Sequence, residues 1–267
     1  MIFTELVNLL VESGACIDKR DSCGQTCLLI ACKLQHLEMV QYLVSKGSNV
    51  NATDKDSNTP LLLAIDSGLN INTSLVKFLL NVGADPNHSN LNGFTPLLNT
   101  IRRSSDHILD GQDIVQALLE HNCHVDVHEY KFYGESALNI SITRNQDGIT
   151  EKLIRSGANV DEKSINGQSP FMRLIMEDKI DLAKLALANS RLPIGQFPIG
   201  LEHIQRMIKN QDVELFNHLL KEYNLVPRLK HLCRIKLRKW FSFKADLVIQ
   251  QIQIPPTLQQ YLLLKEL

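Results

Sequence analysis

Residues 83–101 read GADPNHSNLNGFTPLLNTI, and this stretch decides the fold because both of its landmarks recur along the chain. One landmark is a Thr or Ser that opens a Thr-Pro-Leu-type turn, found at Thr26, Thr59, Thr95, Ser136 and Ser169. The other is Gly-Ala-Asp-x-Asn in its best copy, with versions at 14–18, 47–51, 83–87, 122–126 and 157–161. The Thr/Ser landmark returns after 33, 36, 41 and 33 residues, which indicates a repeat protein.

Each repeat predicts a turn followed by two short helices. The Thr/Ser side chain can cap the first helix, and Pro60, Pro96 and Pro170 suit its first position. A left-handed residue is needed where the second helix ends, which accounts for Gly14, Gly47, Gly83 and Gly157. The pattern resembles the ankyrin repeat. The resemblance implies an all-α ankyrin-repeat solenoid, in which stacked helix pairs build one core and projecting turns form fingers.

The copies are uneven in length. Three residues are inserted near 69–73, six near 105–110 and two in the turn 127–136. We expect these insertions in loops between helices or in the fingers. Thr4–Asp18 fits only a second helix and its turn. Either a divergent cap is absent there, or the natural chain starts earlier, and the pattern leaves both open.

The last forty residues carry the sharpest functional signal. Residues 227–241 read PRLKHLCRIKLRKWF, a basic amphipathic helix whose apolar stripe must be covered, either by the last repeat or by a partner protein. The spacing Leu229-x-x-x-Cys233-x-x-x-Leu237 matches the elongin-binding box of SOCS-box proteins. Residues 252–255 read IQIP and lie where that family carries its cullin box, with Gln253 in place of the usual first proline.

This second resemblance implies two sets of binding residues at the end of the chain. The elongin-binding set is Leu229, Leu232, Cys233 and Leu237. The cullin-binding set is Ile252, Ile254, Pro255, Leu258 and Tyr261. The expected domains are therefore a partial ankyrin unit at 1–18, repeats at 19–194, a degenerate last unit at 195–226 and a SOCS box at 227–267.

Composition and charge bound the function classes. The net charge is only −1, but residues 227–267 hold eight Lys/Arg and two Asp/Glu, which supports a boundary near Pro227. No apolar run approaches the ~20 residues of a membrane span, and Met1–Glu5 does not begin a signal-peptide pattern. Six irregularly spaced cysteines suit a reducing compartment. We expect a cytoplasmic protein without a membrane partner, with the nucleus as an alternative location.

Metal-binding and catalytic interpretations find less support. A zinc site would draw on His121, Cys123, His124 and His128, but their spacing is not that of structural zinc and a turn explains most of them. Core and turn roles account better for the cluster Cys16, Cys23, Cys27 and Cys32. No phosphate loop or nucleophile elbow is present. We therefore expect no enzyme, no metal and no cofactor.

One finger is both lengthened and aromatic. It carries Tyr130, Phe132 and Tyr133, residue types that dominate protein interfaces. We expect these three to contact a target protein, although they could instead fold back onto the next turn.

The combined resemblance to ankyrin-repeat and SOCS-box proteins implies a substrate-recognition adaptor. Elongin C and elongin B would bind the elongin box, and cullin-5 with its RING partner would bind the cullin box. The ankyrin stack would hold an unknown target for ubiquitin transfer by others. A stand-alone ankyrin scaffold with a C-terminal helical cap is the alternative. We expect no nucleic-acid partner, because the basic helix carries no interleaved aromatic platform and no groove-reading motif; such binding would require salt-sensitive association with DNA or RNA.

Overall fold

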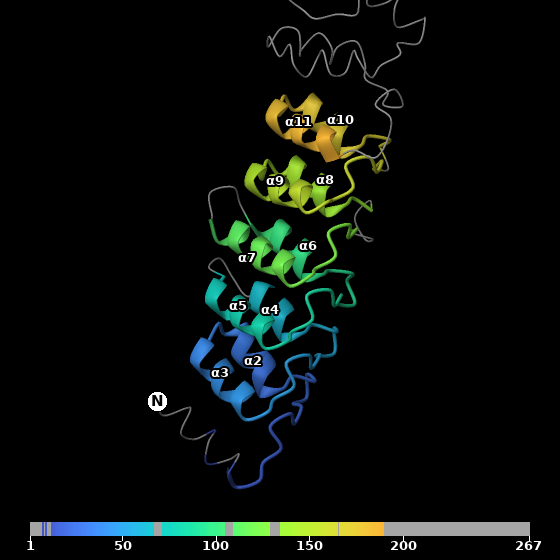
Figure 1. Cartoon of the computed structure of the whole chain (residues 1–267). Helices are drawn as coiled ribbons and strands as arrows, with labels where there is room; N and C mark the ends of the chain where they lie inside the picture. Colours follow the sequence, from blue (N-terminus) through green and yellow to red (C-terminus); the bar gives the residue numbers. More distant parts are fainter. Residues whose placement is uncertain are drawn as a thin grey trace, which may run out of the picture. The chain divides into compact units, whose positions relative to one another are not determined.

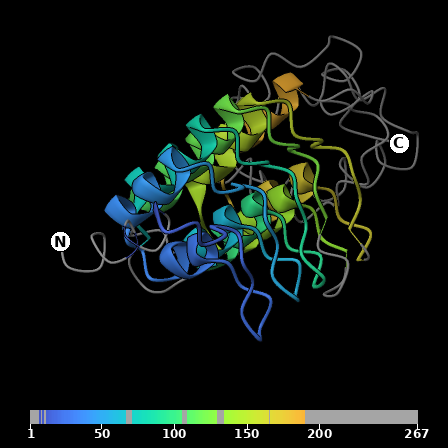
Figure 2. The same ribbon diagram turned by 90° about the horizontal axis from the view of Figure 1, so that it is seen from below.

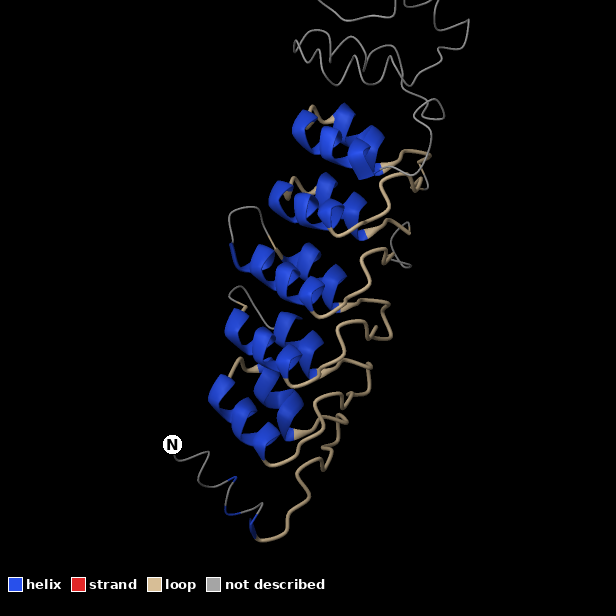
Figure 3. Cartoon of the chain, in the orientation of Figure 1, coloured by secondary structure: helices blue, strands red, loops and turns tan. Residues whose placement is uncertain are grey.

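A computed structural model describes residues 7, 9, 12–66, 71–104, 109–128, 134–164 and 166–189. These residues form helix pairs joined by turns and loops (Figures 1 and 3). The first helices are α2 (Cys27–Lys33), α4 (Pro60–Asp66), α6 (Pro96–Arg103), α8 (Ala137–Thr143) and α10 (Pro170–Met176). The second helices are α3 (Leu37–Ser45), α5 (Thr73–Asn81), α7 (Leu109–Glu120), α9 (Asp147–Arg155) and α11 (Ile180–Asn189). No strand occurs in this part of the chain, whose one β-bridge joins His128 and Ser136.

The chain divides into two compact units. Unit 1 consists of residues 1–159 and 163–167 and holds α2 to α9, whereas unit 2 consists of residues 160–162 and 168–267 and holds α10 and α11. The helical repeat architecture predicted from the two landmarks is confirmed.

The first helices begin as their sequence predicts. The hydroxyl of Thr26 accepts a hydrogen bond from the Leu29 N–H at 3.4 Å, and Thr59 caps α4 in the same way at 3.3 Å. Proline occupies the first position of α4, α6 and α10, where its missing N–H removes no helical hydrogen bond. A cap of this kind stabilises a helix by about 1 kcal/mol. Short helices need this help because a seven-residue helix is unstable alone.

The second helices of unit 1 end in a left-handed residue. Gly47 has a φ of +89°, and a Cβ built at this position would meet nothing within 4 Å. The backbone conformation, and not lack of space, therefore selects glycine. In the fourth copy Asn122 stands in place of the glycine with a φ of +58°, a substitution that asparagine tolerates better than most residues.

Stacking creates the core of unit 1. First helices pack on first helices in the order α2, α4, α6 and α8, and second helices pack in the order α3, α5, α7 and α9. Figure 2 shows these two rows of unit 1, with the fingers projecting on one side. The second residue after each cap is buried in every copy of this unit, at Leu28, Leu61, Leu97 and Leu138. Such periodic burial joins the helix pairs into one continuous core.

The inserted residues fall outside the first helices. The three-residue insertion lies between α4 and α5, and the one in the turn 127–136 lies before α8. The six-residue insertion lies between α6 and α7 except for its last two residues, which belong to α7. This helix accordingly has 12 residues, whereas α3, α5 and α9 have nine each.

Unit 2 repeats the same local chemistry. Ser169 caps α10 by accepting a hydrogen bond from the Met172 N–H at 3.3 Å, and Pro170 follows it. Phe171 and Ala183 are fully buried where α10 packs on α11. Across the described residues of both units, no helix is long and apolar enough to cross a membrane.

Candidate functional site

Side chains at the end of each Gly-Ala-Asp-x-Asn landmark tie one turn of unit 1 to the next. Asn51 accepts a hydrogen bond from the Asp85 N–H at 2.9 Å, and Asn87 accepts one from the His124 N–H at 2.6 Å. Asp18 and Asp126 make the same contact to the following turn. We call these four side chains the turn ladder. It explains why only Asp and Asn occupy this position in unit 1, since both offer a short side chain with an acceptor oxygen.

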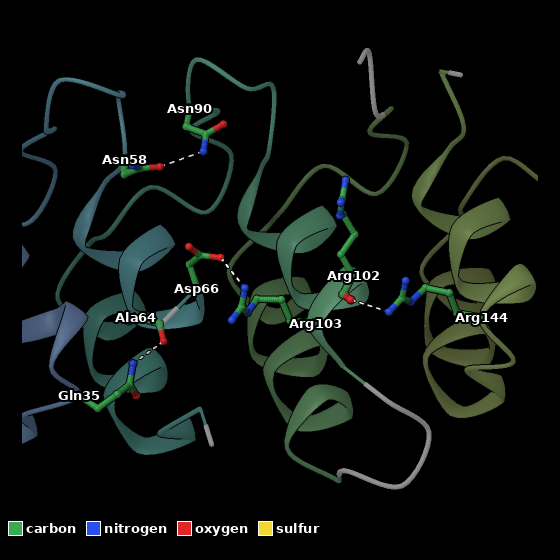
Figure 4. Close-up of polar contacts among 8 residues, drawn as sticks. All are labelled: Gln35, Asn58, Ala64, Asp66, Asn90, Arg102, Arg103 and Arg144. Atoms are coloured by element: carbon green, nitrogen blue, oxygen red, sulfur yellow. Dashed lines mark hydrogen bonds and ion pairs between the residues drawn. The ribbon is translucent and has the colours of Figure 1, made fainter. Parts of the chain in front are cut away.

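The finger tips of the first three repeats are shaped by their own side chains. In the first finger the Asp21 carboxylate accepts hydrogen bonds from the N–H groups of Cys23 and Gln25, both at 2.8 Å. Asp54 and Asn90 repeat this turn in the next two fingers. Neighbouring fingers are also joined directly, for example where the Asn90 amide donates to Asn58 Oδ1 at 2.8 Å (Figure 4). The fingers therefore form a connected and pre-shaped surface.

Charged and apolar side chains line up at the C-terminal ends of the first helices. We call this set the helix-end row: Lys33, Leu34, Asp66, Arg102, Arg103 and Arg144. Its members share one position because they stand seven or eight residues after the caps of successive first helices. Two contacts show directly that α6 lies between α4 and α8 along this row. Arg103 pairs with Asp66 at 2.9 Å, and Arg144 Nη2 donates to the Arg102 carbonyl at 2.6 Å.

The side chains of all three arginines have partners, and Figure 4 shows those of Arg103 and Arg144. The Arg102 guanidinium lies 4.5 Å from the ring centre of Phe94 at the base of a finger. A cation over an aromatic ring contributes about 0.5–1 kcal/mol at an exposed site. All three arginines stand at the C-terminal ends of helices, where the helix dipole favours positive charge. The row therefore presents cations at defined positions on unit 1.

The α2 end of the same face exposes apolar side chains beside Lys33. Leu34 is 71% exposed and Ile30, one turn before it, is 37% exposed. The residues equivalent to Ile30 in the next repeats, Leu63 and Asn99, are at most 9% exposed. Exposed apolar side chains of this size mark candidate contact sites when they adjoin one another.

Comparison with known families assigns both parts of the chain. A family model described as ankyrin repeats in three copies matches residues 3–90 and 69–164, and a model of the SOCS box matches residues 225–263. The chain belongs to the ankyrin-repeat and SOCS-box proteins. The ankyrin match contains the whole turn ladder and the helix-end row, so the described surface of unit 1 is ankyrin surface.

Relatives of this ankyrin-repeat and SOCS-box protein share its repeats. It is 32% identical over 156 residues to a putative ankyrin repeat protein, YahD, of Escherichia coli, covering 57% of this chain and 73% of that one. It is 27% identical to the mouse B-cell lymphoma 3 protein homolog, covering 67% of this chain and 39% of that one. The chain thus spans well under half of the latter relative. An ankyrin repeat domain from Acinetobacter baumannii matches with a TM-score of 0.53 at 24% identity over 58% of this chain and 76% of that one, which shows the fold alone.

The family assignment carries a coarse function. Ankyrin repeats mediate protein binding, and a SOCS box indicates an adaptor that binds elongin B, elongin C and a cullin. Both are non-catalytic adaptor modules. The sequence-based assignment to this family is confirmed.

The residues predicted to bind partners lie outside the described part of the chain. This applies to the elongin-binding set from Leu229 to Leu237 and to the cullin-binding set from Ile252 to Tyr261. Both sets fall inside the SOCS-box match at 225–263, and the role of each residue stays a prediction. Tyr130, Phe132 and Tyr133 also fall outside the described residues. The base of their finger is described, where the Ala137 N–H donates to the Val127 carbonyl at 2.9 Å.

Several of the histidines and cysteines weighed as metal ligands have other roles in the fold. The ring of His121 reaches the Ala117 carbonyl at 2.8 Å and Asn81 Oδ1 at 3.3 Å, and the backbone N–H of His124 donates to Asn87 of the turn ladder. Over the described residues no group of three His, Cys, Asp or Glu side chains could hold a metal ion. Burial raises the pKa of the Cys32 thiol to about 12 and that of Cys123 to about 11, as expected for cysteines in a core.

The sequence analysis did not predict the hydrogen bonds of the turn ladder or the surface formed by the helix-end row. A signal for the ladder was present, because Asp or Asn ends every landmark. The row could be found only by aligning the repeats on their caps and noting that arginine recurs at the seventh and eighth positions.

Proposed function

We propose that this chain is the substrate-recognition adaptor of an elongin B/C–cullin-5 ubiquitin ligase. The observation that carries the proposal is the order of two matches, ankyrin repeats at 3–164 followed by a SOCS box at 225–263. The repeats hold the target protein, the SOCS box recruits the ligase, and ubiquitin transfer is performed by the recruited subunits. A cytoplasmic location belongs to the same proposal, and cell fractionation tests it.

Leu229 and Cys233 anchor the elongin contact in this proposal. They stand one helical turn apart in sequence and enter one apolar pocket on elongin C. Full burial of a leucine stabilises a contact by roughly 1.5–3 kcal/mol, and its truncation also leaves a cavity. Leu229→Ala combined with Cys233→Ala should therefore abolish co-purification of elongins B and C. Undiminished capture by the double variant would contradict the assignment and favour a stand-alone ankyrin scaffold.

The choice of cullin-5 rests on residues 252–261 and is tested separately. A proline at position 253 would preset an extended backbone, so Gln253→Pro should tighten cullin-5 binding without changing elongin binding. Immunoprecipitation of the intact chain should recover cullin-5 in preference to other cullins. Recovery of another cullin, or weaker binding by Gln253→Pro, would show that the box has been assigned wrongly.

Tyr130, Phe132 and Tyr133 belong to the proposed target surface. Large, stiff side chains bury much area at a low entropic cost. Serine at all three positions should reduce ubiquitination of the target while leaving the melting temperature and elongin binding unchanged. A large fall in melting temperature would instead assign these residues to the packing of the finger.

A further inference from the structure

The helix-end row of unit 1 changes character from one repeat to the next. At α2 it offers Leu34, 71% exposed, with Ile30 one turn before it. At α6 and α8 it offers Arg102, Arg103 and Arg144, of which Arg103 and Arg144 are exposed. An apolar side chain and several cations thus share one face of the stack, two repeats apart.

Among the described residues of this row the charges are not balanced. Lys33 and the three arginines stand against one carboxylate within the row, that of Asp66. Asp66 already pairs with Arg103 at 2.9 Å, with both side chains at least one-third exposed. The nearest acidic residue in sequence beyond Arg144 is Asp147, at the start of α9. The row therefore attracts negative charge, and Asp66 competes for one of its arginines.

We propose that the helix-end row binds an extended acidic segment of the target protein, with an apolar side chain of that segment resting on Ile30 and Leu34. This inference rests on the proposed role of the ankyrin repeats in holding a target. Carboxylates match the planar, multiple donors of arginine. Phe94 beneath Arg102 and the Arg102 carbonyl beside Arg144 restrict the motion of these two side chains before binding, which lowers the entropic cost of ordering them.

The repeat spacing sets the pattern of the segment. Packed helices lie about 8–10 Å apart, and an extended chain advances about 3.3 Å per residue. Neighbouring repeats therefore correspond to about three residues of the bound segment. We expect acidic residues about three positions apart opposite α6 and α8, and an apolar residue about six positions from the acidic residue opposite α6.

A peptide fits this row better than a nucleic acid does. Asp66 lies between the cations and Leu34, where a phosphate backbone would meet both a carboxylate and an apolar surface. The chain as a whole also has a net charge of −1, whereas nucleic-acid modules are characteristically basic.

A peptide selection on the full chain, co-expressed with elongins B and C, tests the proposal. A displayed library of random twelve-residue peptides is enriched on the complex, and the affinity of enriched peptides is measured by fluorescence anisotropy. We expect acidic peptides with the stated spacing. Arg103→Gln combined with Arg144→Gln should weaken their binding by about tenfold, since each exposed ion pair contributes modestly.

Two further variants separate charge recognition from damage to the fold. Asp66→Asn should tighten binding by about threefold because it frees Arg103, a gain that misfolding cannot produce. Arg155→Gln removes an exposed cation on α9, paired with Glu151 on its own helix at 2.8 Å, and should leave the affinity unchanged.

Several results would overturn the inference. One is that the selection enriches no acidic peptide. Another is that Arg155→Gln weakens peptide binding as much as the Arg103 and Arg144 substitutions do. A third is that neither Asp66→Asn nor the arginine substitutions change the peptide affinity. Displacement of bound peptide by a mixed-sequence single-stranded DNA at equal concentration would favour a nucleic acid instead. Elongin co-purification is scored in the same samples. If the unsubstituted chain does not co-purify with elongins B and C, the adaptor proposal is wrong, but peptide binding can still be measured.

Discussion

Gln146 is the most informative single position for testing how neighbouring repeats hold together. Its side chain is 2% exposed, and its Nε2 donates to the Ile101 carbonyl at 2.9 Å and to the Ser104 carbonyl at 2.6 Å. Both acceptors belong to the preceding repeat, at the C-terminal end of α6. The other amide atom, Oε1, is buried without a hydrogen-bond partner. On folding, this side chain therefore forms two hydrogen bonds to the preceding repeat, and its Oε1 loses its hydrogen bonds to water.

Gln146→Met keeps the length of the side chain and removes its polar atoms. Two hydrogen bonds contribute roughly 0.5–1.5 kcal/mol each, and their loss leaves two buried carbonyls without this donor. Removing the unpaired Oε1 offsets part of the loss, by about 1 kcal/mol. Leaving the two carbonyls without this donor costs roughly 1 kcal/mol more, so the expected fall in the free energy of unfolding is about 2 kcal/mol. For a protein of this size the melting temperature should drop by about 4–8 °C.

Circular dichroism during heating measures the melting temperature, and hydrogen exchange locates the change. Because repeat stability is the sum of local and nearest-neighbour terms, exchange should accelerate most in α8 and α9. Gln116→Met is the matched control: the same substitution at an exposed site on α7, expected within about 0.5 kcal/mol of the native chain. If Gln146→Met melts at the native temperature, the two donor bonds do not stabilise the stack and the reasoning fails.

Two further predictions concern unit 1. Asn87 accepts a hydrogen bond from the His124 N–H and donates one to the Asn122 carbonyl at 3.3 Å. In urea unfolding, Asn87→Asp should retain the first bond and therefore destabilise the protein by about 1 kcal/mol less than Asn87→Ala. Equal effects of the two substitutions would show that the acceptor contact is unimportant. Burial raises the pKa of Cys32 to about 12, so at pH 8 iodoacetamide should modify the exposed Cys27 and spare Cys32 in the native chain. Mass spectrometry of the labelled peptides checks this, and equal labelling of the two thiols would contradict the packing of α2.

Features set by one residue at a fixed position could be predicted from the sequence. Thr26 caps a helix because its hydroxyl reaches an N–H three residues ahead, and Gly47 ends one because its φ is positive. Such effects depend on local geometry alone. The C-terminal motifs were found by their resemblance to a known family, and the SOCS-box match at 225–263 confirms the module but not the role of each residue.

Features set by the stacking of repeats could not be predicted in the same way. Gln146 is polar yet buried because its partners belong to another repeat, 42 and 45 residues away. The helix-end row likewise depends on the register between helices of different repeats, which no single repeat encodes.

The turn ladder has a direction that matters during synthesis of the chain. Every acceptor side chain precedes its donor N–H, by 31 residues from Asp18 to Asn49 and by 37 from Asn87 to His124. Chains are made from the N-terminus, and early segments begin to fold first. Each turn that leaves the ribosome therefore finds a side-chain oxygen already placed to receive its backbone. The stack can grow as it is translated, with every completed repeat serving as a template for the next.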